Sequence, residues 1–245
     1  MDNAAYSTLT RQTGLLNEMR SVAQNIANMS TTGYRREGVI FSEFMQDLGP
    51  DHPALSMAAG RVREMDFSQG PLTKTDGPFD LAIEGEGFFL VATPQGERLT
   101  RAGHFARNAA GELVTPQGYN LLDGGGAPVF VAPDARGIGI AADGTISADG
   151  QPIGQVGLWA PADPNAMVRV GDTQFDPGGG THPLIEGGVL LQGYLESSNV
   201  NPVIEMTRMI EVQRAYALGQ SLLDREDERI RNVVRTLGSN RGISI

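Results

Sequence analysis

The chain has 245 residues, of which 40% are apolar and 20% charged, so it can form one large or two modest domains around a real hydrophobic core. Its formal net charge is −10 and the excess acid lies in the middle of the chain, which disfavours binding to nucleic-acid phosphates and to anionic membranes. The complete lack of cysteine excludes disulfides, thiolate zinc sites and a cysteine nucleophile.

A long amphipathic helix is predicted at the amino end. It begins at Asp2 or Asn3, either of which can accept hydrogen bonds from the first-turn amides, and it runs to about Asn28. The chain then bends at Gly33, because a glycine can adopt the positive φ that often follows a helix. Apolar residues recur along this helix at intervals of seven, namely Leu9, Leu16 and Ala23, with Met19 and Ile26 at the alternate positions and Gln12 as the exception.

The next two segments differ in composition. Residues 36–70 are expected to form an extended linker with an irregular insertion near residues 49–60, because two X-Pro steps at Pro50 and Pro53 interrupt any long element. Residues 71–198 alternate short apolar runs with glycine-containing turn signals, which is typical of a mostly antiparallel β domain.

A second long helix is predicted from Val203 to Leu237, with Pro202 in its first turn. Its apolar residues also recur at intervals of seven, which is the pattern of a coiled-coil seam. The companion positions are polar, so one edge of the seam is imperfect. The seam residues are Met209, Tyr216, Leu223, Ile230 and Leu237, and the polar companions are Gln213, Gln220 and Asp227.

Together these patterns predict an α+β fold in which the N- and C-terminal helices pair as a coiled coil beside a central, mostly antiparallel β domain. Residues 1–35 and 199–245 would form one terminal helical assembly domain, and the body left without them is expected to fold by itself. The apolar surface of the two stripes is too small to offset the entropy of ordering both helices, so the pair is expected to need neighbours. The alternative is that both helices are ordinary amphipathic helices covering a core.

No residue pattern predicts chemistry. The three histidines, His52, His104 and His182, are far apart and lack metal-ligand spacing, and no phosphate-binding glycine loop or Gly-x-Ser-x-Gly elbow occurs. We therefore expect no enzymatic activity, no catalytic residue, no metal, no cofactor and no small-molecule substrate.

Four stretches of sequence, taken in order, match one known family. They are residues 25–36, residues 80–89, residues 100–115 and residues 195–216, with Asn25-Ile26-Ala27-Asn28 and Leu195-Glu196-Ser197-Ser198-Asn199 as the most specific runs. These stretches resemble the flagellar rod and hook proteins of bacteria. Residues 45–65 and 123–185 lie outside the resemblance. Within the family, the chain is most similar to the proximal rod branch, and the distal rod branch is the alternative. The features that favour the proximal branch are residues 1–4, the sequence Arg36-Glu37-Gly38 and the modest length.

The resemblance implies a structural subunit of the flagellar basal-body rod, in which the terminal helices polymerise into a tubular drive shaft that transmits torque. It implies other rod proteins, further copies of the chain and the flagellar export apparatus as partners, and a periplasmic location in the basal body. Export without a cleaved signal peptide is expected, because the amino end has no basic-then-apolar signal. The expected assembly interface comprises Leu9, Leu16, Met19, Ala23, Asn25, Ile26, Asn28, Asn199, Met209, Tyr216, Leu223, Ile230 and Leu237, with Gly33 as the hinge.

A rival interpretation from another class is a secreted, β-rich binding module that is oligomerised by its helical ends. An exposed shelf of aromatic residues on the β domain would favour that module, yet the chain has only one Trp and five Tyr. A deep cleft with convergent ionisable groups would instead favour an enzyme.

Overall fold

The computed structural model describes residues 2–46, 55–171, 173–184 and 187–239. The chain divides into two compact units. One, here called the helical unit, contains Met1–Ala27, Glu37–Asp66 and Asn201–Ile245, and the other, here called the β unit, contains Asn28–Arg36 and Phe67–Val200. The α+β class predicted from the sequence is confirmed.

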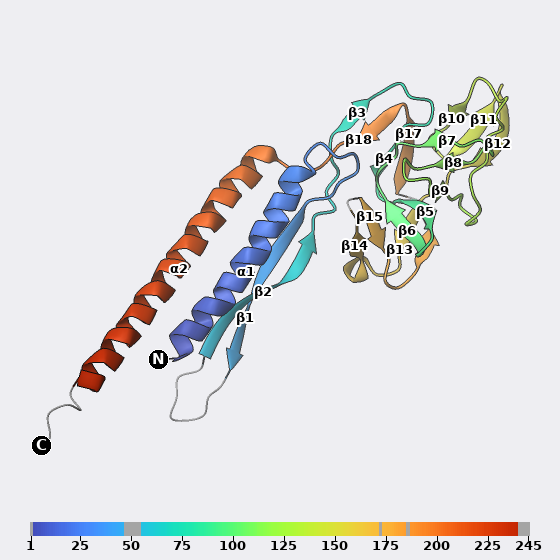
Figure 1. The fold of residues 1–245 in the computed structure, drawn as a ribbon. Helices are drawn as coiled ribbons and strands as arrows, with labels where there is room; N and C mark the ends of the chain where they lie inside the picture. Colours follow the sequence, from blue (N-terminus) through green and yellow to red (C-terminus); the bar gives the residue numbers. More distant parts are fainter. Residues whose placement is uncertain (1, 47–54, 172, 185–186, 240–245) are drawn as a thin grey trace, which may run out of the picture. The chain divides into compact units, whose positions relative to one another are not determined.

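The helical unit consists of two helices and one hairpin. Helix α1 spans Asp2–Ala27 and helix α2 spans Pro202–Ser239, so both predicted helices lie within two residues of their expected limits. Strands β1 (Glu37–Gln46) and β2 (Leu55–Met65) pair antiparallel. Helix α1 lies between α2 and this hairpin, so it packs against a different element on each of two faces (Figure 1).

The hairpin replaces the extended linker that the sequence predicts for residues 36–70. Its strands stay in register from the Glu37–Met65 pair to the Gln46–Leu55 pair, with one irregularity between Ile40 and Phe41. The prolines that suggested an interruption fall at residues 50 and 53, outside the described residues, and neither belongs to β1 or β2. Of the expected insertion near residues 49–60, the part up to residue 54 lies outside the described residues and the rest belongs to β2.

The β unit is built from short antiparallel strands. Seven of them form one sheet in the order β14-β15-β6-β5-β9-β8-β7, and β10-β11-β12 form a second sheet of three. The pairs β13-β16, β17-β4 and β18-β3 complete the unit. The bounds of these strands are β3 Leu72–Lys74, β4 Leu81–Gly85, β5 Phe89–Thr93, β6 Gly96–Thr100, β7 Ala106–Arg107, β8 Leu113–Val114, β9 Asn120–Leu121, β10 Gly139–Ile140, β11 Thr145–Ala148, β12 Gln151–Gln155, β13 Trp159–Pro161, β14 Val168–Val170, β15 Gln174–Asp176, β16 Thr181–Pro183, β17 Gly188–Gln192 and β18 Tyr194–Glu196, with a short 3-10 helix at Pro164–Ala166.

The core of the β unit is a single cluster of aliphatic and aromatic side chains. Phe89 and Phe105 meet edge to face at its centre, with ring centroids 5.2 Å apart, and both rings are buried. Leu81, Ile83 and Val91 pack into the same cluster. Burial of this size is sufficient to hold many short strands together, even though strands of two or three residues contribute little by themselves.

Candidate assembly surface

Three polar contacts set the register of the two helices in the helical unit. Near one end, Asn25 Nδ2 donates to Glu205 Oε2 at 3.2 Å, and near the middle Arg208 forms an ion pair with Glu18. Further along, Gln12 Nε2 donates to the carbonyl oxygen of Tyr216 at 3.0 Å. Residue numbers fall on α1 as they rise on α2, so the helices run antiparallel.

The buried apolar residues of α1 lie one position before the residues predicted from the heptad spacing. Leu15 and Val22 are buried, whereas Leu9 and Ala23 are exposed and Leu16 is half-buried. The difference arises because α1 packs against two elements, which widens its apolar stripe beyond the two positions per heptad of a simple coiled coil. Met19 and Ile26, the predicted alternate positions, are half-buried.

On α2 some of the predicted heptad residues are half-buried, and the inward-facing residues beside them are not the ones predicted. Met209, Tyr216 and Leu223 are half-buried as far as residue 223, whereas Ile230 and Leu237 are exposed. The positions four residues before them face inward, because Glu205 and Val212 are buried at 0% and 2% exposure. Gln213, Gln220 and Asp227, which the sequence analysis took as companions, are exposed. The polar edge of the stripe therefore faces outward from α2.

Asn25 joins three of the four elements of the helical unit. Its Nδ2 donates to the carbonyl oxygen of Glu37 at 2.8 Å, and its Oδ1 accepts from the backbone amide of Glu37 at 3.0 Å. With the contact to Glu205, one fully buried amide side chain binds α1 to both β1 and α2. A buried amide that loses such partners costs about 1–3 kcal/mol, so Asn25 is a specific determinant of this arrangement.

Asn199 plays a similar part in the β unit. Its Oδ1 accepts from the backbone amide of Arg36 at 2.6 Å, and its Nδ2 donates to the carbonyl oxygen of Ser68 at 3.0 Å. Asn28 forms a local turn instead, since its Oδ1 accepts from Thr31 Oγ1 at 3.0 Å. All three asparagines expected in the assembly interface thus form hydrogen bonds within the chain.

Gly33 lies at a turn with φ of +70°, so the positive φ expected there is confirmed. Its amide donates to the carbonyl oxygen of Glu196 at 2.7 Å. A Cβ at this position would lie 2.3 Å from the backbone nitrogen of Ala102, which leaves no room for any other residue. The turn at residue 33 is therefore a fixed part of the β unit.

A buried carboxylate between two arginines holds the same turn. Glu196 is fully buried, its Oε1 lies 2.5 Å from Arg35 Nη1, and its Oε2 lies 3.3 Å from Arg101 Nη1. Oε1 also accepts from the amide of Gly70 at 2.8 Å. Burial lowers the pKa of Arg101 to about 10 while the charge of Glu196 acts to raise it, so the guanidinium stays protonated at neutral pH.

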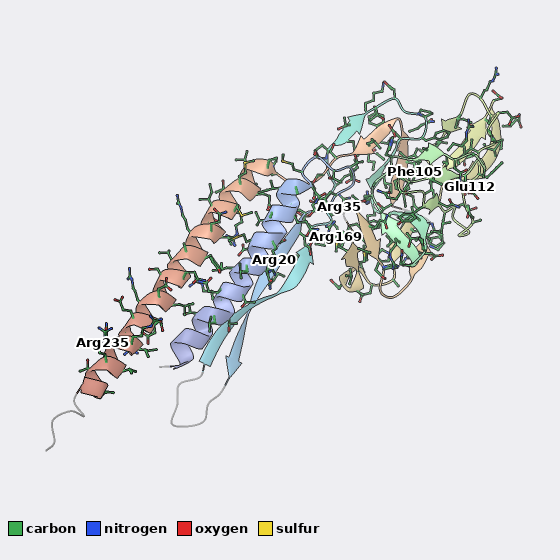
Figure 2. The ribbon with its side chains drawn as sticks, in the orientation of Figure 1. Arg20, Arg35, Phe105, Glu112, Arg169 and Arg235 are labelled. Carbon is green, nitrogen blue, oxygen red and sulfur yellow. The ribbon has the colours of Figure 1, made fainter. Side chains whose placement is uncertain are left out.

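Arg169 covers this turn from β14. Its guanidinium stacks on the ring of Tyr34 at 4.5 Å and on that of Phe175 at 5.1 Å, and its Nη2 donates to the carbonyl oxygen of Arg35. Figure 2 shows Arg35 and Arg169 close together. Tyr34 is fully buried as a result. Residues 28–36 are an integral element of the β unit, whereas the sequence analysis placed residues up to 35 in the helical domain and residue 36 in the linker.

Apolar exposure is concentrated on α2. Among the residues whose side-chain exposure the structure describes (8–40, 64–171, 173–184 and 187–237), more than half of the exposed large apolar side chains lie on this helix. A surface of this kind usually marks a site of protein association. These side chains are Val203, Ile204, Met206, Ile210, Leu218, Leu222, Ile230, Val233, Val234 and Leu237.

The β unit offers a shallow groove but no evident chemistry. The groove has a volume of about 640 Å³ and is lined by Phe67, Phe88, Arg101, His182 and mostly apolar neighbours. Across the described residues, no group of three histidine or acidic side chains could hold a metal ion. No helix within the described ranges is long and apolar enough to cross a membrane.

Comparison with known proteins gives the class of the protein. The family described as "Flagellar hook protein FlgE/F/G D1 domain" matches residues 82–148, and "Flagellar basal body rod FlgEFG protein C-terminal" matches residues 191–236. The first match lies in the β unit, and the second runs from β17 through most of α2. The chain belongs to this family of flagellar basal-body rod and hook proteins, and it is a structural rod subunit.

Relatives refine this class to the FlgF group. The flagellar basal-body rod protein FlgF of Caulobacter vibrioides is 39% identical over 244 residues, covering 97% of this chain and 99% of that protein. FlgF of Mesorhizobium japonicum is 34% identical over 98% of this chain and 99% of its own. FlgG of Caulobacter vibrioides is 31% identical over 85% of this chain and 89% of its own, a weaker likeness. The subunit is thus FlgF-like, and the proximal rod resemblance found in the sequence is confirmed.

Several functional residues escaped the sequence analysis. Glu205 reads as an ordinary first-turn acid of a helix, and Arg35 and Arg101 read as surface charges, because a single sequence gives no sign that these charges are buried. Val212 was detectable, since it completes the 3-and-4 spacing with Met209 and Tyr216.

Proposed function

We propose that the chain polymerises through its helical unit, with α1 and α2 paired as a coiled coil, into the inner wall of the tubular rod. Its partners are further copies of itself and other rod proteins, and it reaches the periplasm through the flagellar export apparatus. The rod transmits motor torque. The protein has no enzymatic role.

The observation that carries this proposal is the exposed apolar face of α2. The helix buries one side against α1 and leaves large aliphatic side chains uncovered along most of its length. An isolated subunit gains nothing from this exposure, whereas a subunit packed among similar helices removes these side chains from water at about 25 cal/mol per Å². Folding of the helical unit is then coupled to assembly, which meets the need for neighbours expected from the sequence.

Replacing exposed leucines with charged residues tests the proposal. The double substitution Leu218→Glu with Leu222→Glu alters two exposed positions on α2, so the β unit of the isolated subunit should fold normally. Charge at an apolar contact should exclude the variant from purified basal bodies and abolish swimming. Gln213→Glu adds a negative charge to an exposed position of the same helix and should leave both unchanged. Normal incorporation of the double variant would contradict assembly through this face.

The rival binding module has weaker support. Among the described residues of the β unit, Phe67 and Phe130 are the only phenylalanines with exposed side chains. Two such rings do not form a shelf of stacked aromatic residues. An apolar groove with one exposed ring does not favour a glycan site over a protein contact. Retained swimming in a strain that lacks the protein would revive the rival.

A further inference from the structure

Two side chains near the end of the β unit in sequence hold its beginning. Glu196 contacts Arg35, the amide of Gly70 and the guanidinium of Arg101, and the last two lie 126 and 95 residues before it in the chain. Asn199 adds a hydrogen bond to the turn that spans 163 residues. We call these five residues the clamp, and all of them belong to the β unit.

The core cluster of the β unit is made by a different part of the chain. Its buried side chains lie between Leu81 and Leu190 in the sequence, so Arg101 is the one clamp residue within that stretch. Hairpins such as β5-β6 and β11-β12 join strands that are neighbours in the chain. Contacts of this local kind form at a low cost in chain entropy, so the core can begin to form before the two ends of the unit meet.

The clamp gains nothing from partial closure. The side chain of Glu196 is 0% exposed and that of Arg35 is 1% exposed, so neither can be buried favourably without the other. Burial also lowers the pKa of Arg101 to about 10, which reflects the cost of removing its charge from water. Closure therefore needs all the segments at once, through contacts that span 95 to 163 residues.

We infer that the clamp is a late-forming kinetic lock, which closes after the rate-limiting step of folding and slows the unfolding of the β unit. A contact that is absent from the transition state stabilises the native state alone. It therefore raises the barrier to unfolding and leaves the rate of folding unchanged.

Such a lock suits a subunit that must cross the export apparatus and then stay folded in the rod. Before the clamp closes, the β unit reopens readily, and after closure its lifetime is set by a slow unfolding rate. This use of the lock rests on the proposed function, whereas the order of folding does not. The two can therefore fail separately.

Refolding and unfolding rates of the full chain test the inference, with the buried Trp159 as the fluorescent reporter of the β unit. Glu196→Gln should accelerate unfolding at least tenfold and leave refolding within about twofold of the native rate. Glu97→Gln removes the same charge at an exposed position and should change neither rate by more than about twofold. Val91→Ala, at a fully buried core position in β5, should slow refolding at least threefold because the core forms first.

The share of the lost stability that appears in the refolding rate decides the outcome. If this share exceeds roughly one third for Glu196→Gln, the clamp is already formed at the folding barrier and the inference is overturned. Unchanged refolding of Val91→Ala would also overturn the order of core before clamp. If Glu196→Gln does not fold, Asn199→Ala is judged by the same limit, because it removes a half-buried amide and leaves the ion pairs in place. None of these rates requires a rod, so a failure here leaves polymerisation through the helical unit untouched.

Discussion

The charge of Glu196 is expected to be the most sensitive single feature of the β unit. Glu196→Gln keeps the size of the side chain and an oxygen that can accept from Gly70, but it removes the negative charge between Arg35 and Arg101. Two guanidiniums, 1% and 5% exposed, would then face each other without the carboxylate that lies between them. Removing one partner from a buried ion pair costs about 3–5 kcal/mol. For a unit of this size, that loss lowers the melting temperature by roughly 10 °C.

The single tryptophan makes this prediction easy to measure. Trp159 lies in β13 and is buried, so its fluorescence reports the unfolding of the β unit alone. Urea titration should shift the midpoint of Glu196→Gln strongly, while the m-value stays constant. Glu97→Gln, at an exposed position, removes the same charge and should stay within about 0.5 kcal/mol of the native protein. Equal midpoints for the two variants would refute the assignment of a critical buried charge.

Two further predictions concern the turn at residues 28–36. Gly33→Ala should destabilise the β unit by about 2 kcal/mol more than Gly118→Ala does. Both glycines have positive φ, but only at residue 33 would a Cβ meet the backbone. Equal urea midpoints for the two variants would show that the neighbouring backbone shifts freely. A fragment of residues 28–200 should unfold cooperatively when followed by tryptophan fluorescence. A fragment of residues 37–200 should lose this transition, because it lacks the buried Tyr34 and Arg35. A native-like transition in the shorter fragment would show that the turn is dispensable.

The long helices were accessible to sequence analysis because their signals are local. A capping residue, a heptad of apolar positions and a terminal glycine or proline act within a few residues of chain, so the limits of α1 and α2 follow from the pattern alone. The β class of residues 71–198 is readable for the same reason, since turn residues recur between short apolar runs.

The hairpin of residues 37–65 was missed because pairing is not local. An apolar segment followed by Gly-Pro and His-Pro steps fits a linker as well as two strands. The strands are stabilised by contact with α1, which the sequence does not reveal. The one-residue offset of the buried line on α1 has the same origin, because burial by two elements at once widens the stripe that either element alone would require.

By itself the sequence determined the limits of the two helices and the β class of the middle of the chain, because periodicity and capping depend on neighbours along the chain. The tertiary structure alone decided which charges are buried. Glu196 comes to lie between Arg35 and Arg101, and Asn25 joins Glu37 to Glu205, across separations that no local pattern records. A charged side chain is stable in the interior only where its partner arrives from elsewhere in the chain, and that arrival is a property of the fold.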